Sequence, residues 1–449
     1  MTKRLALLVG IFALALLFHS TLVRAQAPPG PIPPAQEQPS SLDAAPQGAA
    51  KIVTAYTLPP ELYKKTEHLS KIRLEFIIVG TIYGLIVLWL ILRLKLAPRY
   101  RDWGERASSN RFVQVLVFAP LLLLSIDILK LPQEIYAHTV LRDYGLSVQG
   151  WGSWAWDQAK GEIVSVILGI ALITTLYSVI RMSPRRWWFY FWLVSLPIVV
   201  LLTFLQPLII NPLFHKFEPL QQKDPALTAA LEQMVQRSGE NIPPDRMFLM
   251  GEAVKGTDLN AYVTGFGASK RMVIYDTTVA KMTTPQNVAV MGHETGHYVL
   301  NHITKGLLIS FAALFIAFYL GFRCLGWLLA WRGTAWGIRG VDDLASLPVL
   351  LLLLSIFSFI ASPVSNTISR YFEHQADQYS IEVTHGLTPD AAQVGAQAFQ
   401  VLGETDLEYP DPSRLNVLLT YDHPPTRDRI QFFLTYDPWA SSGTGEFVH

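Results

Sequence analysis

The sequence predicts a multispanning α-helical membrane protein that carries a small α+β domain outside its spans. Three observations support this fold class: 51% of the 449 residues are hydrophobic and only 16% are charged, long uncharged runs recur along the chain, and a polar stretch in the middle mixes helix and strand patterns. An average soluble protein has about 25% charged residues. The excess apolar surface must therefore be covered by lipid or lie in a very large soluble core, and the repeated runs favour lipid.

The net charge and the cysteine count exclude several classes of site. The formal net charge is +1, and no basic tract is interleaved with aromatic residues, which argues against nucleic acid as a partner. Cys324 is the only cysteine in the chain, so neither an intramolecular disulfide framework nor a thiolate-rich zinc site can form. A metal ion must be held by nitrogen and oxygen atoms.

The first 50 residues have the pattern of an export signal followed by a linker. Two basic residues precede an apolar run from Leu5 to Phe18, and Val23 and Ala25 then supply the small residues that suit signal-peptidase cleavage. We interpret residues 1–25 as a signal peptide, with an uncleaved anchor helix as the alternative. Residues 26–50 are rich in Pro, Ala, Gln and Ser and are expected to form a disordered linker.

Six later runs approach or reach the length needed to cross a bilayer. A span needs about 20 apolar residues, and charged side chains at its ends can extend toward water, so somewhat shorter runs still qualify. Four of the runs lie within residues 51–215 and two within residues 306–369. The runs cover residues 76–92, 112–126, 163–180, 187–215, 306–322 and 344–369.

The short loops between these runs predict the orientation of the protein in the membrane. Loops rich in Lys and Arg stay on the cytoplasmic side. The first and third loops are strongly basic, with Arg93, Lys95, Arg99, Arg101, Arg106 and Arg111 in the first and Arg181, Arg185 and Arg186 in the third. The second loop, residues 131–160, is nearly balanced. We therefore expect a protein of the bacterial cytoplasmic membrane whose polar segments 216–305 and 370–449 lie on the extracytoplasmic side.

Residues 216–305 have the pattern of an α+β domain. Helical spacing covers residues 226–239. Three short apolar segments, separated by turns that contain Gly, Lys or Asp, are typical of strands. These segments are residues 246–251, 259–267 and 271–278.

Two helices around this domain carry polar residues at regular spacing. Thr284 and Pro285 provide an N-cap and a first-turn residue for a helix that contains the stretch MGHETGHYVLNH, residues 291–302. A second helix continues from the last span through residues 365–384 and ends near Gly386. The first of these helices leads directly into the fifth span.

Two histidines and a glutamate in the first helix are spaced for metal chemistry. His293 and His297 are four residues apart, which places them about 40° apart around a helix, so both imidazoles can reach one ion. Glu294 lies about 100° from His293 and can contact a water on the open side of that ion, as a general base would. The alternative is a pair of solvated histidines on a surface helix.

The second helix offers the carboxylate that such a site requires. Glu373 and Asp377 are also four residues apart. A catalytic zinc ion takes three protein ligands and keeps one position open, and two His with one Glu form a known set. We therefore predict one Zn2+ per chain on His293, His297 and Glu373, with Asp377 accepting a hydrogen bond from the far N–H of a ligating imidazole. A solvated acidic face is the alternative for the two acids.

Six stretches in a consistent order resemble the type I CAAX prenyl endopeptidases and, more distantly, the HtpX heat-shock membrane proteases. They are NPLFHKFEPL at 211–220, NAY at 260–262, KRMVIYDTT at 270–278, GHETGHYVLNH at 292–302, EHQAD at 373–377 and HPPTRDRI at 423–430. The resemblance runs from about residue 70 to residue 435. It implies a zincin-type metalloprotease domain of the gluzincin class, with Glu294 as the base, in a water-filled chamber enclosed by membrane helices.

That chamber explains why a metal helix would lead into a span. If the helix ran on unbroken, a rise of about 1.5 Å per residue would put the ion roughly 15 Å from the first lipid-facing turn. His302 and His374 follow ligands in the sequence but fall on other faces of their helices. We interpret both as structural residues or as neighbours of the ligands.

The resemblance also implies roles for residues outside the metal site. Asn260, Ala261 and Tyr262 would lie on an edge strand that receives the substrate peptide as an added strand, with strand core as the alternative for Ala261. His423 and Arg429 would stabilise the oxyanion of the reaction. Without the resemblance, His423 would be interpreted as a loop residue.

The site, rather than the fold, predicts the function. We expect an integral-membrane zinc endopeptidase that hydrolyses peptide or protein substrates, some of them membrane-associated, with the lipid bilayer as its other partner. The alternatives are a catalytically inactive, zinc-braced scaffold or quality-control interaction protein, and a transporter, against which the scarcity of charged residues in the runs argues. An exported bacterial protein is not expected to meet prenylated substrates, so the CAAX specificity is left open.

Overall fold

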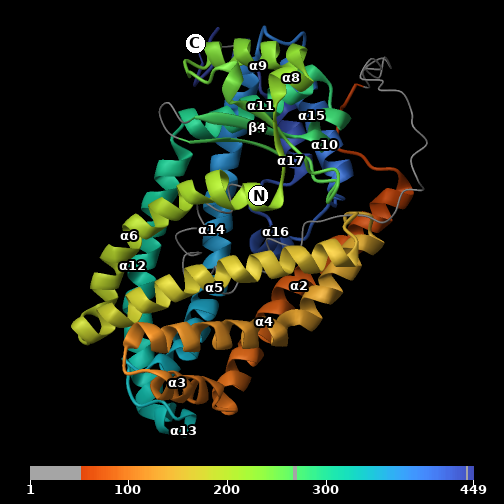
Figure 1. The fold of residues 1–449 in the computed structure, drawn as a ribbon. Coiled ribbons are helices and arrows are strands. Elements are labelled where there is room, and N and C mark those ends of the chain that lie inside the picture. The colour runs from red at the N-terminus through yellow and green to blue at the C-terminus, as the bar shows by residue number, and fades with distance from the viewer. Residues whose placement is uncertain (1–51, 266–269, 441–442, 449) are drawn as a thin grey trace.

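The computed structural model describes residues 52–265, 270–440 and 443–448, and it confirms the predicted fold class. Long helices occupy one end of the molecule, and a mixed domain of helices and strands occupies the other (Figure 1). The signal peptide and the linker expected at residues 1–25 and 26–50 lie outside the described residues.

Six helices in the described part of the chain are long and apolar enough to cross a membrane. The six predicted runs coincide with them. They are α2 (Pro60–Arg93), α4 (Arg111–Asp143), α5 (Trp151–Met182), α6 (Trp187–Leu205), α12 (His302–Leu328) and α14 (Leu347–Thr384). A π-helical turn (Gln206–Ile210) and the short α7 (Asn211–Phe214) extend α6.

Five of the helices are longer than the predicted runs, because a run counted by uncharged residues stops at the first charge while the helix continues; α6 is shorter than its run. The second predicted loop, residues 131–160, is therefore wrong: helices cover all of it except residues 144–150. Lys, Arg and Glu are good helix formers, and charged turns beyond the apolar stretch can be solvated. The loops that join the spans are shorter than the sequence pattern indicates.

Large apolar side chains cover the outside of these helices. Ile128, Ile167, Ile316 and Ile360 are each more than half exposed. A soluble protein rarely presents such a surface, whereas the hydrocarbon of a bilayer covers it at no cost. Between the helices a separate apolar core forms, and Phe118 is among its fully buried members.

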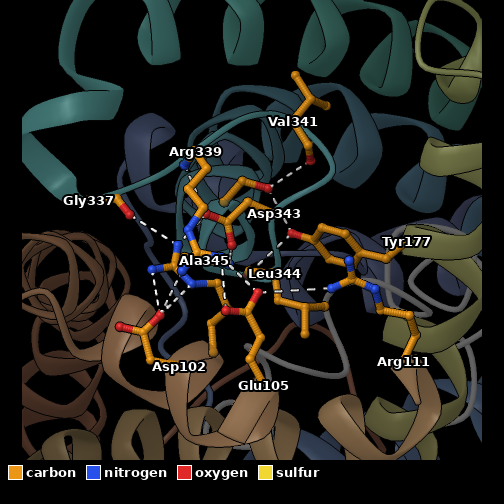
Figure 2. A network of polar contacts seen from close by, with 12 residues as sticks. Asp102, Glu105, Arg111, Tyr177, Gly337, Arg339, Val341, Asp343, Leu344 and Ala345 are labelled. Carbon is orange, nitrogen blue, oxygen red and sulfur yellow. Dashed lines mark hydrogen bonds and ion pairs between the residues drawn. The ribbon is translucent and has the colours of Figure 1, made fainter. Parts of the chain in front are cut away.

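A polar network closes the end of the helices that lies farthest from the mixed domain (Figures 1 and 2). Arg101 on α3 (Leu96–Ala107) donates to Asp343 at 2.5 Å, and both side chains are buried. Arg339 donates to Asp102 and Glu105, which both lie on α3. Tyr177 on α5 bonds to the segment that begins α14. The network therefore joins α3 to α5 and α14.

The mixed domain contains a four-stranded sheet in the order β1-β2-β4-β3. β2 and β4 pair in parallel, and the other two pairs are antiparallel. β3 is the last strand in this order and therefore lies at one edge of the sheet. The three predicted strand segments contain β2, β3 and β4, whereas β1 is too short and too close to a proline to give a strand signal. The bounds are Phe217–Pro219 for β1, Met247–Met250 for β2, Ala261–Thr264 for β3 and Arg271–Tyr275 for β4.

Helices cover the sheet and join it to the membrane helices. α11 (Thr284–Val299) lies at the centre and packs against β3, α14, α9 (Pro225–Arg237) and α15 (Ala391–Thr405). Met291 of α11 and Tyr379 of α14 are buried in the core that these elements share. The continuous helix α14 therefore carries residues of the mixed domain at one end and a membrane span at the other.

The two ends of α11 differ in detail from the sequence pattern. Its N-cap is Thr283 instead of Thr284, because Thr283 forms a reciprocal capping box with Gln286. Its other end is a break: α12 starts as a separate helix, and Asn301 between them has φ of 57°. Asn is one of the few residues besides Gly that adopt this left-handed conformation readily. The metal helix therefore does not run unbroken into the span.

Candidate metal centre

Three side chains from two helices converge on one point of the mixed domain. His293 and His297 project from adjacent turns of α11, with their Nε2 atoms 3.2 Å apart. Glu373 on α14 brings Oε2 to 3.2 Å from His293 Nε2 and Oε1 to 3.6 Å from His297 Nε2. All three side chains are buried. Within the described residues, no other group of His, Cys, Asp or Glu brings three ligand atoms this close together.

The donor set and its spacing fit a zinc ion. Zinc binds imidazole nitrogen and carboxylate oxygen at about 2.0–2.2 Å, so two ligand atoms at a tetrahedral angle lie about 3.3 Å apart. The two Nε2 atoms lie 3.2 Å apart, and they lie 3.2 and 3.6 Å from the nearer Glu373 oxygens, which matches this spacing. Two nitrogens and one carboxylate leave the fourth tetrahedral position open.

Two glycines allow α11 and α14 to approach closely enough to share an ion. A Cβ atom added at Gly296 would lie 2.9 Å from the Cβ of Tyr379, and one at Gly292 would lie 3.1 Å from a methyl carbon of Val383. Any larger residue would push α14, and with it Glu373, away from the histidines. No sequence pattern indicates this close contact, although a spacing of four places both glycines on one face of α11.

Asp377, one turn after Glu373 on α14, binds the far side of a ligand ring. Its Oδ1 lies 2.7 Å from His293 Nδ1. Arg429 on α17 (Thr426–Thr435) donates to both oxygens of Asp377, from Nε at 2.9 Å and from a terminal nitrogen at 2.6 Å. Burial disfavours the charge on Arg429, but the charge and hydrogen bonds of Asp377, together with the charges of Glu373 and Glu408, raise the pKa of the guanidinium above its ordinary value. Arg429 therefore faces Asp377.

Glu294 and His423 border the same point. Glu294 is buried, and its Oε1 lies 4.0 Å from His293 Nε2. His423, in the turn before α17, has Nε2 at 3.2 Å from Glu373 Oε2. The other nitrogen of that ring, Nδ1, lies 3.0 Å from Asp422 Oδ1. The structure therefore brings both sequence-predicted groups beside the metal position.

The predicted substrate strand lies beside the metal helix. β3 forms an edge of the sheet and packs against α11. Ala261 and Tyr262 are buried, so their side chains contribute to the core. Asn260 precedes the strand, with its carbonyl accepting from Tyr275 N at 3.0 Å and its Oδ1 accepting from Ala261 N at 2.8 Å.

The two remaining histidines of the sequence analysis lie in different surroundings. His302 contacts His297, with 3.1 Å between their Nδ1 atoms, and its Nε2 lies 3.1 Å from Gln375 Oε1. His374 is exposed, and its ring packs against Phe432 with the centroids 4.4 Å apart. Helical periodicity does not predict the contact of His302, and no pattern in the sequence draws attention to Gln375.

Comparisons with known proteins agree with this site and this fold. Residues 46–216 match the model of the CAAX prenyl protease N-terminal region with five membrane helices, and residues 221–436 match peptidase family M48. The uncharacterized metalloprotease YhfN of Bacillus subtilis is 32% identical over 87% of this chain and 90% of its own. The human CAAX prenyl protease 1 homolog is 26% identical over 78% of this chain and 79% of its own.

A solved structure shares the fold along almost the whole chain. The crystal structure of S. mikatae Ste24p superposes with a TM-score of 0.70 and 21% sequence identity, and the match covers 96% of this chain and 98% of that one. The family matches and the Bacillus relative together span both the membrane helices and the metal centre. The chain therefore belongs to peptidase family M48 and is an integral-membrane metalloprotease related to the CAAX prenyl proteases.

Proposed function

We propose that the chain is a zinc endopeptidase whose ion is held by His293, His297 and Glu373. The observation that supports this most directly is the spacing of 3.2 to 3.6 Å among the two histidine Nε2 atoms and the two Glu373 carboxylate oxygens, between two closely packed helices. The protease unit is formed by residues 216–305 and 370–449, which are separated in the sequence by two spans. This placement puts the site next to the membrane helices.

The residues around the ion divide the chemistry of hydrolysis among them. Zinc in such a site acidifies a water and polarises the carbonyl of the scissile bond. Glu294 takes the proton from the attacking water and delivers it to the leaving amine. Asp377, 2.7 Å from His293 Nδ1, holds that ring in the tautomer that presents Nε2 to the ion. Arg429 acts through Asp377, because its Nε and one terminal nitrogen bind that carboxylate.

His423 is the group best placed to stabilise the oxyanion of the tetrahedral intermediate. Its Nε2 lies 3.2 Å from Glu373 Oε2 and therefore borders the open side of the site. Both ring nitrogens face carboxylate oxygens, one from Glu373 and one from Asp422. An N–H donor at this position suits a developing oxyanion.

We propose that the substrate peptide adds to β3 as a further strand. The support is the edge position of β3 and its packing against α11, because a peptide added to this edge would lie beside the proposed metal position. Asn260 stands where the peptide would enter or leave this strand and offers an amide for backbone groups. The buried Ala261 and Tyr262 support the strand from behind.

The substrates are proposed to be exported or membrane-associated polypeptides rather than prenylated ones. The basic loops at residues 93–111 and 181–186 lie at the end of the helices opposite the mixed domain (Figure 1). Such loops stay in the cytoplasm, which supports an extracytoplasmic position for the protease site in a bacterial membrane. The test uses Gln236→Cys on α9 and Ser109→Cys after α3, each in a Cys324→Ser background. An impermeant maleimide should label only the first in intact cells, and labelling only of the second would reverse the orientation.

The activity itself is tested with a panel of fluorogenic peptides and detergent-purified protein. Wild-type protein should cleave at least one peptide, and a chelator should abolish the cleavage. Glu294→Gln should reduce turnover by about 10² to 10⁴ with zinc still bound, whereas the matched control Glu218→Gln on the exposed β1 should leave it unchanged. Zinc binding with no chelator-sensitive cleavage in either wild type or Glu294→Gln would support a zinc-braced scaffold instead, and cleavage by Glu294→Gln at the wild-type rate would remove Glu294 as the base. Chelator-insensitive uptake into vesicles would support a transporter.

A further inference from the structure

His302 makes a contact that the proposed mechanism does not yet use. It is the first residue of α12, and its Nδ1 lies 3.1 Å from the Nδ1 of the ligand His297. Both side chains are buried, with exposed fractions of 4% and 7%. Two nitrogens at this distance form a hydrogen bond only if one carries a proton and the other offers a lone pair.

Gln375 decides the direction of that hydrogen bond. Its Oε1 lies 3.1 Å from His302 Nε2, and a carbonyl oxygen can only accept, so Nε2 carries the proton. The Nδ1 of a neutral His302 ring is then an acceptor, and His297 Nδ1 must be the donor. His297 therefore keeps its lone pair on Nε2, the atom that faces Glu373 and His293. The Phe372 ring stacks on the His302 ring, with a centroid distance of 4.5 Å and an interplanar angle of 10°, and so fixes the orientation of the imidazole.

The break between α11 and α12 makes this contact possible. On one unbroken helix, residues five apart would point about 140° away from each other, at about 100° per residue. Asn301, with φ of 57° and ψ of 32°, turns the chain so that His302 faces back toward His297. The left-handed conformation of Asn301 thus places the acceptor, His302 Nδ1, behind the ring of His297.

We propose that Gln375 and His302 form a relay that orients His297 and fixes its tautomer, as Asp377 does for His293. The inference rests on the proposed zinc site, and it deepens that site by naming two positioning residues. The two ligand rings are then held by different means. His293 is held by a charged carboxylate, and His297 by a neutral chain of donors and acceptors.

The test compares two replacements of His302 in the full-length protein. His302→Asn keeps an acceptor at the position of Nδ1, whereas His302→Phe keeps a ring on Phe372 but offers no acceptor. Zinc affinity, measured by competition with a chromophoric chelator, should fall by about 10- to 100-fold in His302→Phe and recover most of that loss in His302→Asn. The visible spectrum of cobalt-loaded protein should shift in the same order, which a purely structural role would not cause.

A second pair keeps the test decisive if His302→Phe does not fold. Gln375→Glu keeps an acceptor for His302 Nε2, and Gln375→Leu removes it. The relay predicts weaker zinc binding in Gln375→Leu than in Gln375→Glu. Equal affinities and equal cobalt spectra for wild type, His302→Phe and Gln375→Leu would overturn the relay. A wild-type protein that binds no zinc would overturn the proposed function itself, so the two failures are distinguishable.

Discussion

Asp377 Oδ1 lies 2.7 Å from His293 Nδ1, and Arg429 donates to both oxygens of the same carboxylate. His293 on α11, Asp377 on α14 and Arg429 on α17 thus form one buried cluster, in which a terminal nitrogen of Arg429 also lies 3.4 Å from His293 Nδ1. Removing one partner of a buried ion pair leaves the other charge uncompensated, which costs far more than losing an exposed pair.

Asp377→Asn should destabilise the metal-free protein by about 3–5 kcal/mol, because the buried Arg429 loses its counter-charge. The measurement is thermal unfolding in detergent without zinc, where the melting temperature should drop by several degrees or more. Asp411→Asn is the matched control, since Asp411 pairs with Arg427 at an exposed position. Similar melting temperatures for both variants would show that the Asp377 pair is not a buried anchor.

Glu373→Gln and Glu294→Gln should separate metal binding from catalysis. Glu373 supplies a ligand atom to the proposed ion, so its amide variant should lose most of the bound zinc. Glu294 lies beside the ion without completing its ligand set, so its variant should keep the zinc and lose turnover. Metal analysis of the two purified proteins checks this directly. If only Glu294→Gln lost zinc, Glu294 would be the metal ligand and Glu373 would not.

Gly296→Ala should loosen the helix pair that carries the site. The added methyl would lie 2.9 Å from the Tyr379 Cβ, and overpacking of this kind typically costs about 1–3 kcal/mol. Zinc affinity should fall as well, because Glu373 moves with α14. Gly321→Ala on α12 is the control, since no atom lies within 4 Å of its added Cβ. Unchanged stability and zinc affinity in Gly296→Ala would argue against the tight α11–α14 contact.

Asp258 should make stability fall as the pH rises. Burial, together with the charge of Glu252, raises the pKa of Asp258 to about 7, whereas an unfolded Asp titrates near about 3.9. The folded state therefore holds the proton more tightly, and this contribution is complete below the unfolded pKa and is lost as the pH rises through the folded pKa. The melting temperature of Asp258→Asn relative to wild type should increase between pH 4 and pH 8. Asp245→Asn, at an exposed site, should show no such trend.

The sequence predicts the membrane architecture and the ligands for clear physical reasons. Spans are recognisable because lipid excludes charge over about 20 residues, and the ligands are recognisable because His293 and His297 share a helix face at a spacing of four. The helix ends between residues 131 and 160 cannot be recognised from the sequence, since solvated turns outside the apolar stretch carry charge without ending a helix.

The rest of the site depends on contacts between segments that are far apart in sequence. The contact between His302 and His297 cannot be predicted from the sequence, because periodicity holds only within one helix and the helix is broken at Asn301. Arg429 carries no local sign that it will bind Asp377, which lies on another helix. β1 ends at Pro219 and is three residues long, so its pairing with β2 is decided by tertiary packing.

X-ray absorption at the zinc K-edge of the purified protein observes the proposed ligands themselves. We expect one zinc per chain with a first shell of nitrogen and oxygen only at about 2.0–2.2 Å, including the imidazole signature of two histidines. The signature of one histidine should disappear in His297→Ala. A wild-type protein without zinc, or a zinc shell with fewer than two imidazoles, would show that His293, His297 and Glu373 do not form the proposed site.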